Sequence, residues 1–325
     1  MAAKVICIDL GTSMTRIWLS SRGNVFDEPT AIAIDSRTGK VAEIGYLASK
    51  AIGRSPYDIK VFDPVQAGVV ADVELCVRFI SQVFINLKLH RALRGSTVLA
   101  SAPNQMTTVE RDALLDVIKN LGARRIIIES SAKMAALGAG VDMSSPKGVL
   151  VLDIGGGISD CGAIALGDIA AARSAKVGGR SFDRAIERFA KNNKNLAIGP
   201  VTSEMAKMRI GSVDTGAENQ FLEVSGRDVV TGLPSSAILS TAELRPILIP
   251  LAEEIADMTE EVLQDVKPEL ASDLVKSGVL VTGGGALIGG MKVFLEKELK
   301  MPIHLASDMP NGVMLGLKKA AEEYI

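Results

Sequence analysis

The same short design occurs twice in this chain, once at its start and once near its middle. Residues 5–13 read VICIDLGTS and residues 149–159 read VLVLDIGGGIS, so each copy is an apolar strand that ends in Asp and leads into a turn of glycine and hydroxyl residues. A second apolar stretch follows each turn, at residues 17–20 and 161–166. Two β-hairpins that open two similar halves favour a duplicated α/β fold over a solenoid of many short repeats.

Each half is long enough to form a core of its own. A chain of 325 residues exceeds what one hydrophobic core usually supports. A polar turn at residues 144–148 (SSPKG) offers the boundary. We therefore expect domain I over residues 1–144, with a small subdomain at about 28–72, and domain II over residues 145–325, with an insert at about 180–245.

Capping residues and apolar spacing locate the helices of the first half. Asp72 can cap a helix whose apolar side chains recur three and four residues apart over residues 73–87. Thr107 and Glu110 form a capping box before the next helix, and Gly122 can end it.

Strand-like stretches at residues 97–102 and 125–128 flank that second helix. The order strand, helix, strand predicts a sheet that is at least partly parallel. In the second half, residues 181–191 and 202–210 are typical of helices, and a polar, β-rich insert follows at residues 221–239.

The last long helix contains two prolines. Ser240 and Glu243 offer a capping box, and Pro246 and Pro250 follow within the same apolar pattern. Since proline removes a backbone hydrogen bond inside a helix, we expect this helix to start late or to kink near the prolines.

Composition and charge exclude several classes of partner and location. Lys and Arg number 36 against 38 acidic residues, and aromatic residues make up 4%, so the chain has neither a basic excess nor the means to stack bases, and we expect no nucleic acid partner. The three cysteines, Cys7, Cys76 and Cys161, are far apart and show no metal-site or disulfide spacing. The two histidines, His90 and His304, stand alone and are expected to have no catalytic or metal-binding role. Without a signal-peptide pattern or an apolar run of about 18 residues, we expect a cytoplasmic protein.

Three glycine-rich turns follow apolar strands, at residues 9–13, 153–157 and 282–286. Glycine lets the backbone approach a phosphate or sugar closely, and the free N–H groups of such turns bind anions. Any one turn can equally be a tight hairpin that needs a positive φ. The three together predict a site for a phosphate or sugar formed by Gly11, Thr12, Ser13, Gly155, Gly156, Gly157, Gly283, Gly284 and Gly285.

Asp9 and Asp153 head the first two turns and are expected to face one another across a cleft between the halves. Because nucleotide phosphates are negative, carboxylates beside them require a cation, and Mg²⁺ is the usual one. The alternative is that either Asp merely caps its own turn. The chain has no Gly-x-x-x-x-Gly-Lys-Ser/Thr run, so it is not a P-loop protein.

The glycine turns resemble the two phosphate motifs and the adenosine motif of the actin superfamily, and other stretches resemble the MreB bacterial actins. These stretches occur in the order of that family and, with the turns, extend from the N-terminus to about residue 290: DEPTAIAID at 27–35, GVVAD at 68–72, LAIG at 196–199, VSGRD at 224–228 and TGLP at 231–234. The resemblance implies a duplicated, ribonuclease-H-like fold in two lobes around a cleft that binds ATP or ADP with Mg²⁺. It also implies self-assembly into filaments that serve cell shape or intracellular organisation.

The resemblance assigns two more residues to the nucleotide. A helix similar to residues 203–211 contacts the ribose and adenine in MreB proteins, which makes Glu204 and Lys207 candidates. The residues alone show only that positions three apart share a helix face, as a solvated ion pair would. The alternative function is a non-filament ATPase or a kinase of the same fold, although no catalytic Asp of a sugar kinase is identifiable.

Two departures from the family pattern concern hydrolysis. Ser131 stands where MreB proteins have a Glu that helps to hold the attacking water, and residues 158–160 read Ile-Ser-Asp in place of Thr-Thr-Glu. Serine is a poor general base, so we expect slow hydrolysis, with Ser131, Ser159 and Asp160 as the candidates that orient water. The alternative is neutral drift in a working ATPase.

A membrane contact is the last implication of the resemblance. Some MreB proteins insert an apolar pair from a loop into the bilayer. The corresponding loop here, residues 89–95, offers Leu93 among basic residues, which predicts at most a weak contact with an anionic membrane surface. A solvated loop is the alternative.

Overall fold

The structure, a computed structural model, describes residues 5–54, 58–89 and 91–325. His90, for which the sequence predicts no role, lies outside the described residues, as do the first four residues of the chain.

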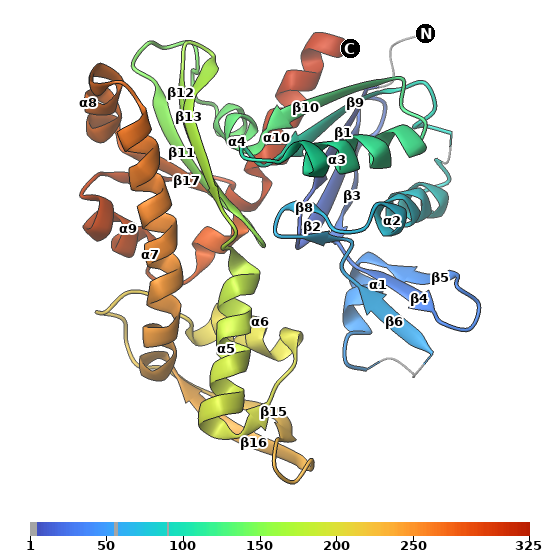
Figure 1. Cartoon of the computed structure of the whole chain (residues 1–325), viewed down its shortest axis with the longest axis vertical. Helices are drawn as coiled ribbons and strands as arrows, with labels where there is room; N and C mark the ends of the chain where they lie inside the picture. The colour runs from blue at the N-terminus through green and yellow to red at the C-terminus, as the bar shows by residue number, and fades with distance from the viewer. Residues whose placement is uncertain (1–4, 55–57, 90) are drawn as a thin grey trace.

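Two sheets of five strands with the same strand order frame the described part of the chain (Figure 1). The first has the order β3-β2-β1-β9-β10 and consists of β3 (Gly23–Pro29), β2 (Met14–Leu19), β1 (Val5–Leu10), β9 (Thr97–Ala102) and β10 (Arg125–Ser130). The second has the order β13-β12-β11-β17-β18 and consists of β13 (Asp168–Ala175), β12 (Ser159–Ala165), β11 (Val149–Ile154), β17 (Val279–Thr282) and β18 (Ile303–Leu305).

The strand directions agree as well. In each sheet the first three strands are antiparallel and the last two run parallel to the strand that carries the Asp. The predicted duplication and the partly parallel sheet are therefore confirmed.

Two helices lie between the sheets, α4 (Ser131–Gly138) and α10 (Gly312–Ala321). Their backbones touch, because a Cβ placed on Gly316 would lie 2.5 Å from the carbonyl carbon of Met134. Helix α10 also packs on β1, where Met314 and Leu317 share a buried cluster with the first strand. The division into domains at residue 144 stays a prediction, since this C-terminal helix packs against the first half.

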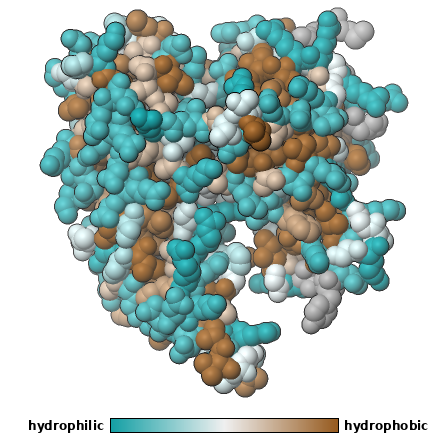
Figure 2. All heavy atoms as spheres, viewed as in Figure 1, coloured by the Kyte–Doolittle hydropathy of each residue, from teal (hydrophilic) through white to brown (hydrophobic). Residues whose placement is uncertain are grey.

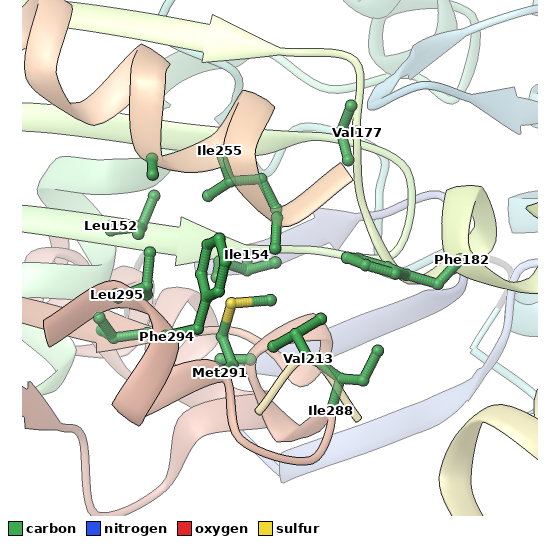
Figure 3. Close-up of a cluster of buried hydrophobic side chains, with 14 of the residues drawn as sticks. Leu152, Ile154, Val177, Phe182, Val213, Ile255, Ile288, Met291, Phe294 and Leu295 are labelled. Atoms are coloured by element: carbon green, nitrogen blue, oxygen red, sulfur yellow. The ribbon is translucent and has the colours of Figure 1, made fainter. Parts of the chain in front are cut away.

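The outer faces of the sheets are covered by amphipathic helices. Helices α2 (Val73–Asn86) and α3 (Thr108–Asn120) pack on the first sheet, and α7 (Thr241–Asp265), α8 (Pro268–Ser277) and α9 (Met291–Leu299) lie beside the second (Figure 1). Figure 3 shows the larger core, in which side chains of α7 and α9 such as Ile255 and Phe294 meet Leu152 and Ile154 of β11.

The three N-caps predicted from the sequence are confirmed, whereas α5 and α6 each begin two residues earlier than expected. Asp72 accepts from the backbone of Leu75, and both capping boxes form, that of Thr107 and that of Ser240. Of the two expectations for the prolines of α7, the late start is wrong, and a kink stays a prediction. Both of its prolines lie on the exposed face of a helix that begins at Thr241, so water can satisfy the carbonyl groups that they leave free, while the opposite face is buried.

Two smaller units extend from the sheets toward the lower end of the view in Figure 1. One is a sheet of β5 (Val41–Ile44), β4 (Ile32–Asp35) and β6 (Ile59–Phe62) with helix α1 (Gly45–Lys50), followed by a short hairpin of β7 (Val65–Gln66) and β8 (Val69–Val70). The other contains α5 (Gly179–Lys194), β14 (Leu196–Ala197), α6 (Pro200–Ile210), β15 (Phe221–Asp228) and β16 (Pro234–Ser240). Apolar atoms gather at the lower tip, where the hairpin of β15 and β16 exposes Val230 and Leu233 (Figure 2).

The side chain of Leu93, in the loop that the sequence predicts to contact a membrane surface, is buried. Leu93 is 3% exposed and belongs to the core under the first sheet, so the expectation that it is available to a bilayer is wrong. Its position follows from the loop, in which Ser96 donates to the Leu93 carbonyl and turns that residue inward, while Arg91 and Arg94 remain exposed. Within the described ranges, no helix is both long enough and apolar enough to span a membrane.

Candidate functional site

The three glycine turns meet at one place between the two sheets. The turn after β1 faces the turn after β11, since a Cβ on Gly156 would lie 2.7 Å from Cβ of Ser13 and one on Gly157 would lie 2.5 Å from Oγ1 of Thr12. The third turn follows β17 and packs on the second, where Gly283 has a φ of +89° and an added Cβ would lie 2.6 Å from Oδ1 of Asp153. Only glycine fits at this contact.

The turns line a cleft of about 390 Å³. With one exception, every candidate site residue from the sequence borders it: Asp9, Gly11, Thr12, Ser13, Ser131, Asp153, Gly155, Gly156, Gly157, Asp160, Glu204, Lys207, Gly283, Gly284 and Gly285. Ser159 is the exception. Successive side chains of β12 point to opposite faces, so Asp160 faces the cleft while the Ser159 hydroxyl is buried and donates to the Val177 carbonyl at 2.8 Å.

The first turn is held in shape by Thr30, which lies in the DEPT stretch. Its backbone N–H donates to the Ser13 carbonyl at 3.0 Å, and its hydroxyl donates to the Gly11 carbonyl at 2.7 Å. The Gly68 N–H donates to Oγ1 of Thr12 at 2.8 Å.

The second turn is held by the start of α5. The backbone N–H groups of Gly179 and Arg180 donate to the carbonyls of Gly155 and Gly156, at 3.0 and 2.7 Å. The N-terminus of this sixteen-residue helix therefore lies directly behind the turn, where its dipole adds positive potential.

Three carboxyl groups border the cleft: Asp160, which is buried, and Asp9 and Asp153, which are half-buried. Burial, followed by the charges of Asp160 and Asp9, raises the pKa of Asp153 to about 8. Burial also raises the pKa of Asp160 to about 6 and moves the pKa of Asp9 upward. Carboxyl groups that disfavour one another's charge in this way fit a cation between them.

The donor set suits Mg²⁺ rather than a metal in a full protein cage. Carboxylate oxygens are the ligands that Mg²⁺ prefers, and it commonly takes only one or two of them, with water and phosphate in the remaining positions. In the described part of the chain, no group of three or more His, Cys, Asp or Glu side chains is placed to hold a metal by itself. Asp9 and Asp153 therefore fit a magnesium ion that is shared with a phosphate ligand.

Asp160 is held from two sides. Its Oδ1 accepts from the Asn104 backbone at 3.0 Å and from the Ser174 hydroxyl at 2.5 Å. Asn104 follows β9 in the first half and Ser174 lies in β13 of the second, so this carboxyl group joins the two halves at the cleft. Ser131 borders the same cleft as the first residue of α4.

Lys207 is already paired on the opposite wall of the cleft. Its Nζ lies 2.8 Å from Oδ1 of Asp183 and donates to the Gly179 carbonyl at 3.3 Å. Glu204 lies one turn earlier on α6 and is exposed at the cleft. The wall continues with apolar side chains, including Met208, Leu287 and Met309.

Two arginines at the cleft were missed by sequence reasoning. Arg16 lies opposite Asp9 in the β1–β2 register, and its Nη1 is 3.5 Å from Oδ2 of Asp9. Arg180 joins the two halves through both oxygens of Asp63, at 2.9 and 3.2 Å. The pairing of the two strands in the first hairpin could have placed Arg16 beside Asp9. No local sequence pattern marks the pair of Arg180 and Asp63.

Known proteins match this chain over nearly its whole length. The family described as MreB/Mbl protein matches residues 3–325. The chain belongs to the MreB/Mbl family. It is 36% identical over 316 residues to the cell shape-determining protein Mbl of Bacillus cereus, covering 97% of this chain and 95% of that protein. It is 34% identical over 330 residues to the cell shape-determining protein MreB of Escherichia coli, covering 99% and 94%.

Solved structures agree with the family. MreB 5 of Spiroplasma citri bound to AMPPNP has a TM-score of 0.93 and 36% identity, covering 99% of this chain and 97% of that one. A MamK double helical filament has a TM-score of 0.76 at 17% identity, covering 98% and 99%, and shows the fold alone. The predicted bacterial actin of the MreB kind is confirmed, and an actin-like cytoskeletal protein is favoured over the kinase alternative.

Proposed function

We propose that this MreB/Mbl protein binds ATP or ADP together with Mg²⁺ in the cleft and assembles with copies of itself into filaments. The observation that carries the proposal is the meeting of three glycine turns and three carboxyl groups in one cleft between the halves. AMPPNP and ADP are bound to MreB 5 of Spiroplasma citri, which is 36–37% identical to this chain, and this supports a nucleotide here. Intracellular organisation or cell shape is the task that the family assigns.

Different parts of the cleft bind the phosphates, the metal ion and the nucleoside. The N–H groups of the first two glycine turns bind the phosphates, and the N-terminus of α5 adds positive potential behind them. Asp9 and Asp153 hold the magnesium ion, which supplies the positive charge that carboxylates and phosphates need in order to share the site. Glu204 accepts from the ribose, and the base lies against Met208 and Leu287 at the third turn.

Hydrolysis in this site is slow but can proceed through Asp160. Ser131 offers a hydroxyl where a general base would be needed. Asp160 is fixed through Oδ1, and no hydrogen bond to its Oδ2 is present among the described residues. With a pKa of about 6, Asp160 is mostly ionised at pH 7 and can accept a proton from a water molecule in the cleft. The Ser159 hydroxyl, which is bonded to Val177, has no part in this proposal.

Self-assembly is assigned to an apolar surface of the insert. The hairpin of β15 and β16 exposes Phe221, Val230, Leu233 and Ile238, at 68, 81, 64 and 59% of their surfaces. Val230 and Leu233 lie together at the tip of this hairpin, and Phe221 and Ile238 lie nearer its base. Exposed apolar side chains of this kind mark a protein contact, and a second copy of the chain is the partner in a filament. A contact of the membrane surface with Arg91 and Arg94 would be electrostatic only.

The direct test of the site is a titration with a fluorescent ATP analogue in the presence of Mg²⁺. Asp153→Asn removes a metal ligand at nearly constant shape and is expected to weaken binding by about 10-fold or more. Asp257→Asn, on the exposed face of α7, is the matched control and is expected to bind like the native chain. Equal affinities for the native chain and Asp153→Asn would refute the assignment.

A further inference from the structure

A row of polar side chains crosses the first sheet from the cleft to the surface. It contains Ser101 of β9, Asp9 of β1, Arg16 of β2 and Asp27 of β3, which lie on four neighbouring strands (Figure 1). The Ser101 hydroxyl donates to Asp9 at 2.9 Å, Arg16 lies 3.5 Å from Asp9, and Nε of Arg16 lies 3.1 Å from Asp27.

Arg16 is the positively charged member of this row and is the least exposed of its three charged side chains. Its side chain is 13% exposed, compared with 17% for Asp9 and 49% for Asp27. The guanidinium group keeps its charge at any ordinary pH, and in a site shielded from water that charge acts over a longer range than at the surface. Its Nη1 lies 3.5 Å from Oδ2 of Asp9, one of the two carboxyl groups assigned to the metal.

Among the described residues, the other cations at the cleft are paired with carboxyl groups that are not assigned to the metal. Lys207 is paired with Asp183, and Arg180 is paired through two bonds with Asp63. Arg16 lies beside the first phosphate turn, because its strand β2 begins at Met14, directly after that turn. A phosphate that approaches Asp9 therefore meets a fixed positive charge before any metal is added.

We propose that Arg16, anchored by Asp27, is a built-in cation of the nucleotide site that lets a nucleoside diphosphate or triphosphate bind without a divalent metal. This rests on the proposed nucleotide site. Arg16 offsets the charge of Asp9, which would otherwise repel the phosphates, and Asp27 holds the guanidinium group in place. The metal then strengthens binding instead of being required for it.

The rival explanation is that Arg16 is a structural ion pair of the sheet. In that case its removal lowers the stability of the chain and leaves the effect of metal on nucleotide affinity unchanged. The ratio of nucleotide affinities with and without metal therefore distinguishes the two explanations.

The test titrates a fluorescent ADP into the native chain, Arg16→Met and Arg22→Met, once with Mg²⁺ and once with EDTA. Arg22 is exposed in the turn after β2 and serves as the matched control. EDTA weakens ADP binding by each protein by some factor. Because Arg16→Met lacks one charge-assisted contact, this factor should be about 10-fold larger for Arg16→Met than for the native chain or Arg22→Met. Equal ratios for all three proteins would overturn the proposal.

Two further variants complete the test. Arg16→Lys keeps the charge and is expected to keep most of the metal-free binding. Asp27→Asn, at a half-exposed position, removes only the anchor. It is expected to weaken ADP binding in EDTA about 3-fold and to leave binding in Mg²⁺ unchanged. If Arg16→Met does not fold, this variant distinguishes the two explanations instead. If the native chain binds in Mg²⁺ but all binding vanishes in EDTA, the inference fails and the proposed function stands; if it binds in neither, both fail.

Discussion

The ion pair of Asp63 and Arg180 joins the two halves beside the cleft and should set how fast nucleotide leaves it. Asp63 lies after β6 in the first half, and Arg180 lies at the start of α5 in the second and borders the cleft. The two bonds between them, 2.9 and 3.2 Å long, are parallel contacts of one guanidinium group with both carboxylate oxygens. Opening of the halves must break both.

The geometry sets the size of the effect. The side chains are 28 and 39% exposed, so solvent screens the attraction, although the paired contact is better than that of an ordinary surface ion pair. Loss of the pair should destabilise the closed state relative to the open state by about 1 kcal/mol. This corresponds to an increase of about 5-fold in the ratio of open to closed molecules.

Asp63→Asn should therefore release bound nucleotide about 5-fold faster, with little change in the rate of binding. In the assay, protein that carries fluorescent ADP is mixed rapidly with an excess of unlabelled ADP, and the loss of the bound signal gives the release rate. Added salt should speed release from the native chain toward the rate of the variant. Asp265→Asn is the matched control, because its partner Arg173 lies 2.6 Å away within the same half. An unchanged release rate in Asp63→Asn, or an equal change in Asp265→Asn, would refute the reasoning.

Three further predictions follow from other parts of the structure. Gly316→Ala forces a methyl group against the Met134 carbonyl and should lower the free energy of unfolding by about 1–3 kcal/mol in denaturant titrations. Gly284→Ala should not, because no described atom lies within 4 Å of its added Cβ, and equal stabilities of the two variants would show that α4 and α10 can move apart. The bond from Lys194 holds the pKa of Glu243 below its ordinary value of 4.5, so its stabilising effect on α7 is present at neutral pH and is lost as the pH falls below 4.5. Glu243→Gln should thus cost about 1 kcal/mol at pH 7 and less in acid, and a pH-independent difference in thermal melting would contradict this. Phosphate release by the native chain should be slow, should rise in Ser131→Glu and should fall further in Asp160→Ala; a fast native rate that neither substitution changes would exclude both residues from hydrolysis.

The frame of the molecule was predictable because its signals are local. The repeated strand and turn at Asp9 and Asp153 fixed the two hairpins, and helix starts such as Thr107 depend on residues three positions apart. The glycine turns were identified for the same reason. Their meeting in one cleft followed from the duplication.

The remaining features depend on contacts between distant segments. Leu93 is buried by the way its loop folds back, and α10 packs on β1 although more than 300 residues of chain separate them. The pair of Asp63 and Arg180 spans 117 residues. No spacing rule reports such contacts, because each partner looks like an ordinary charged or apolar residue in its own segment.

Nucleotide-dependent assembly is the central claim, and sedimentation tests it most directly. The native chain is centrifuged at increasing protein concentrations with ATP and Mg²⁺, and without nucleotide. Val230→Asp, in the apolar hairpin, and Val109→Asp, an equally exposed valine on α3 at 77%, are compared under the same conditions. The account predicts that native protein and Val109→Asp pellet with ATP above a threshold concentration, and that Val230→Asp stays in the supernatant while still binding nucleotide. A native chain that remains a monomer at every concentration, with or without ATP, would contradict it.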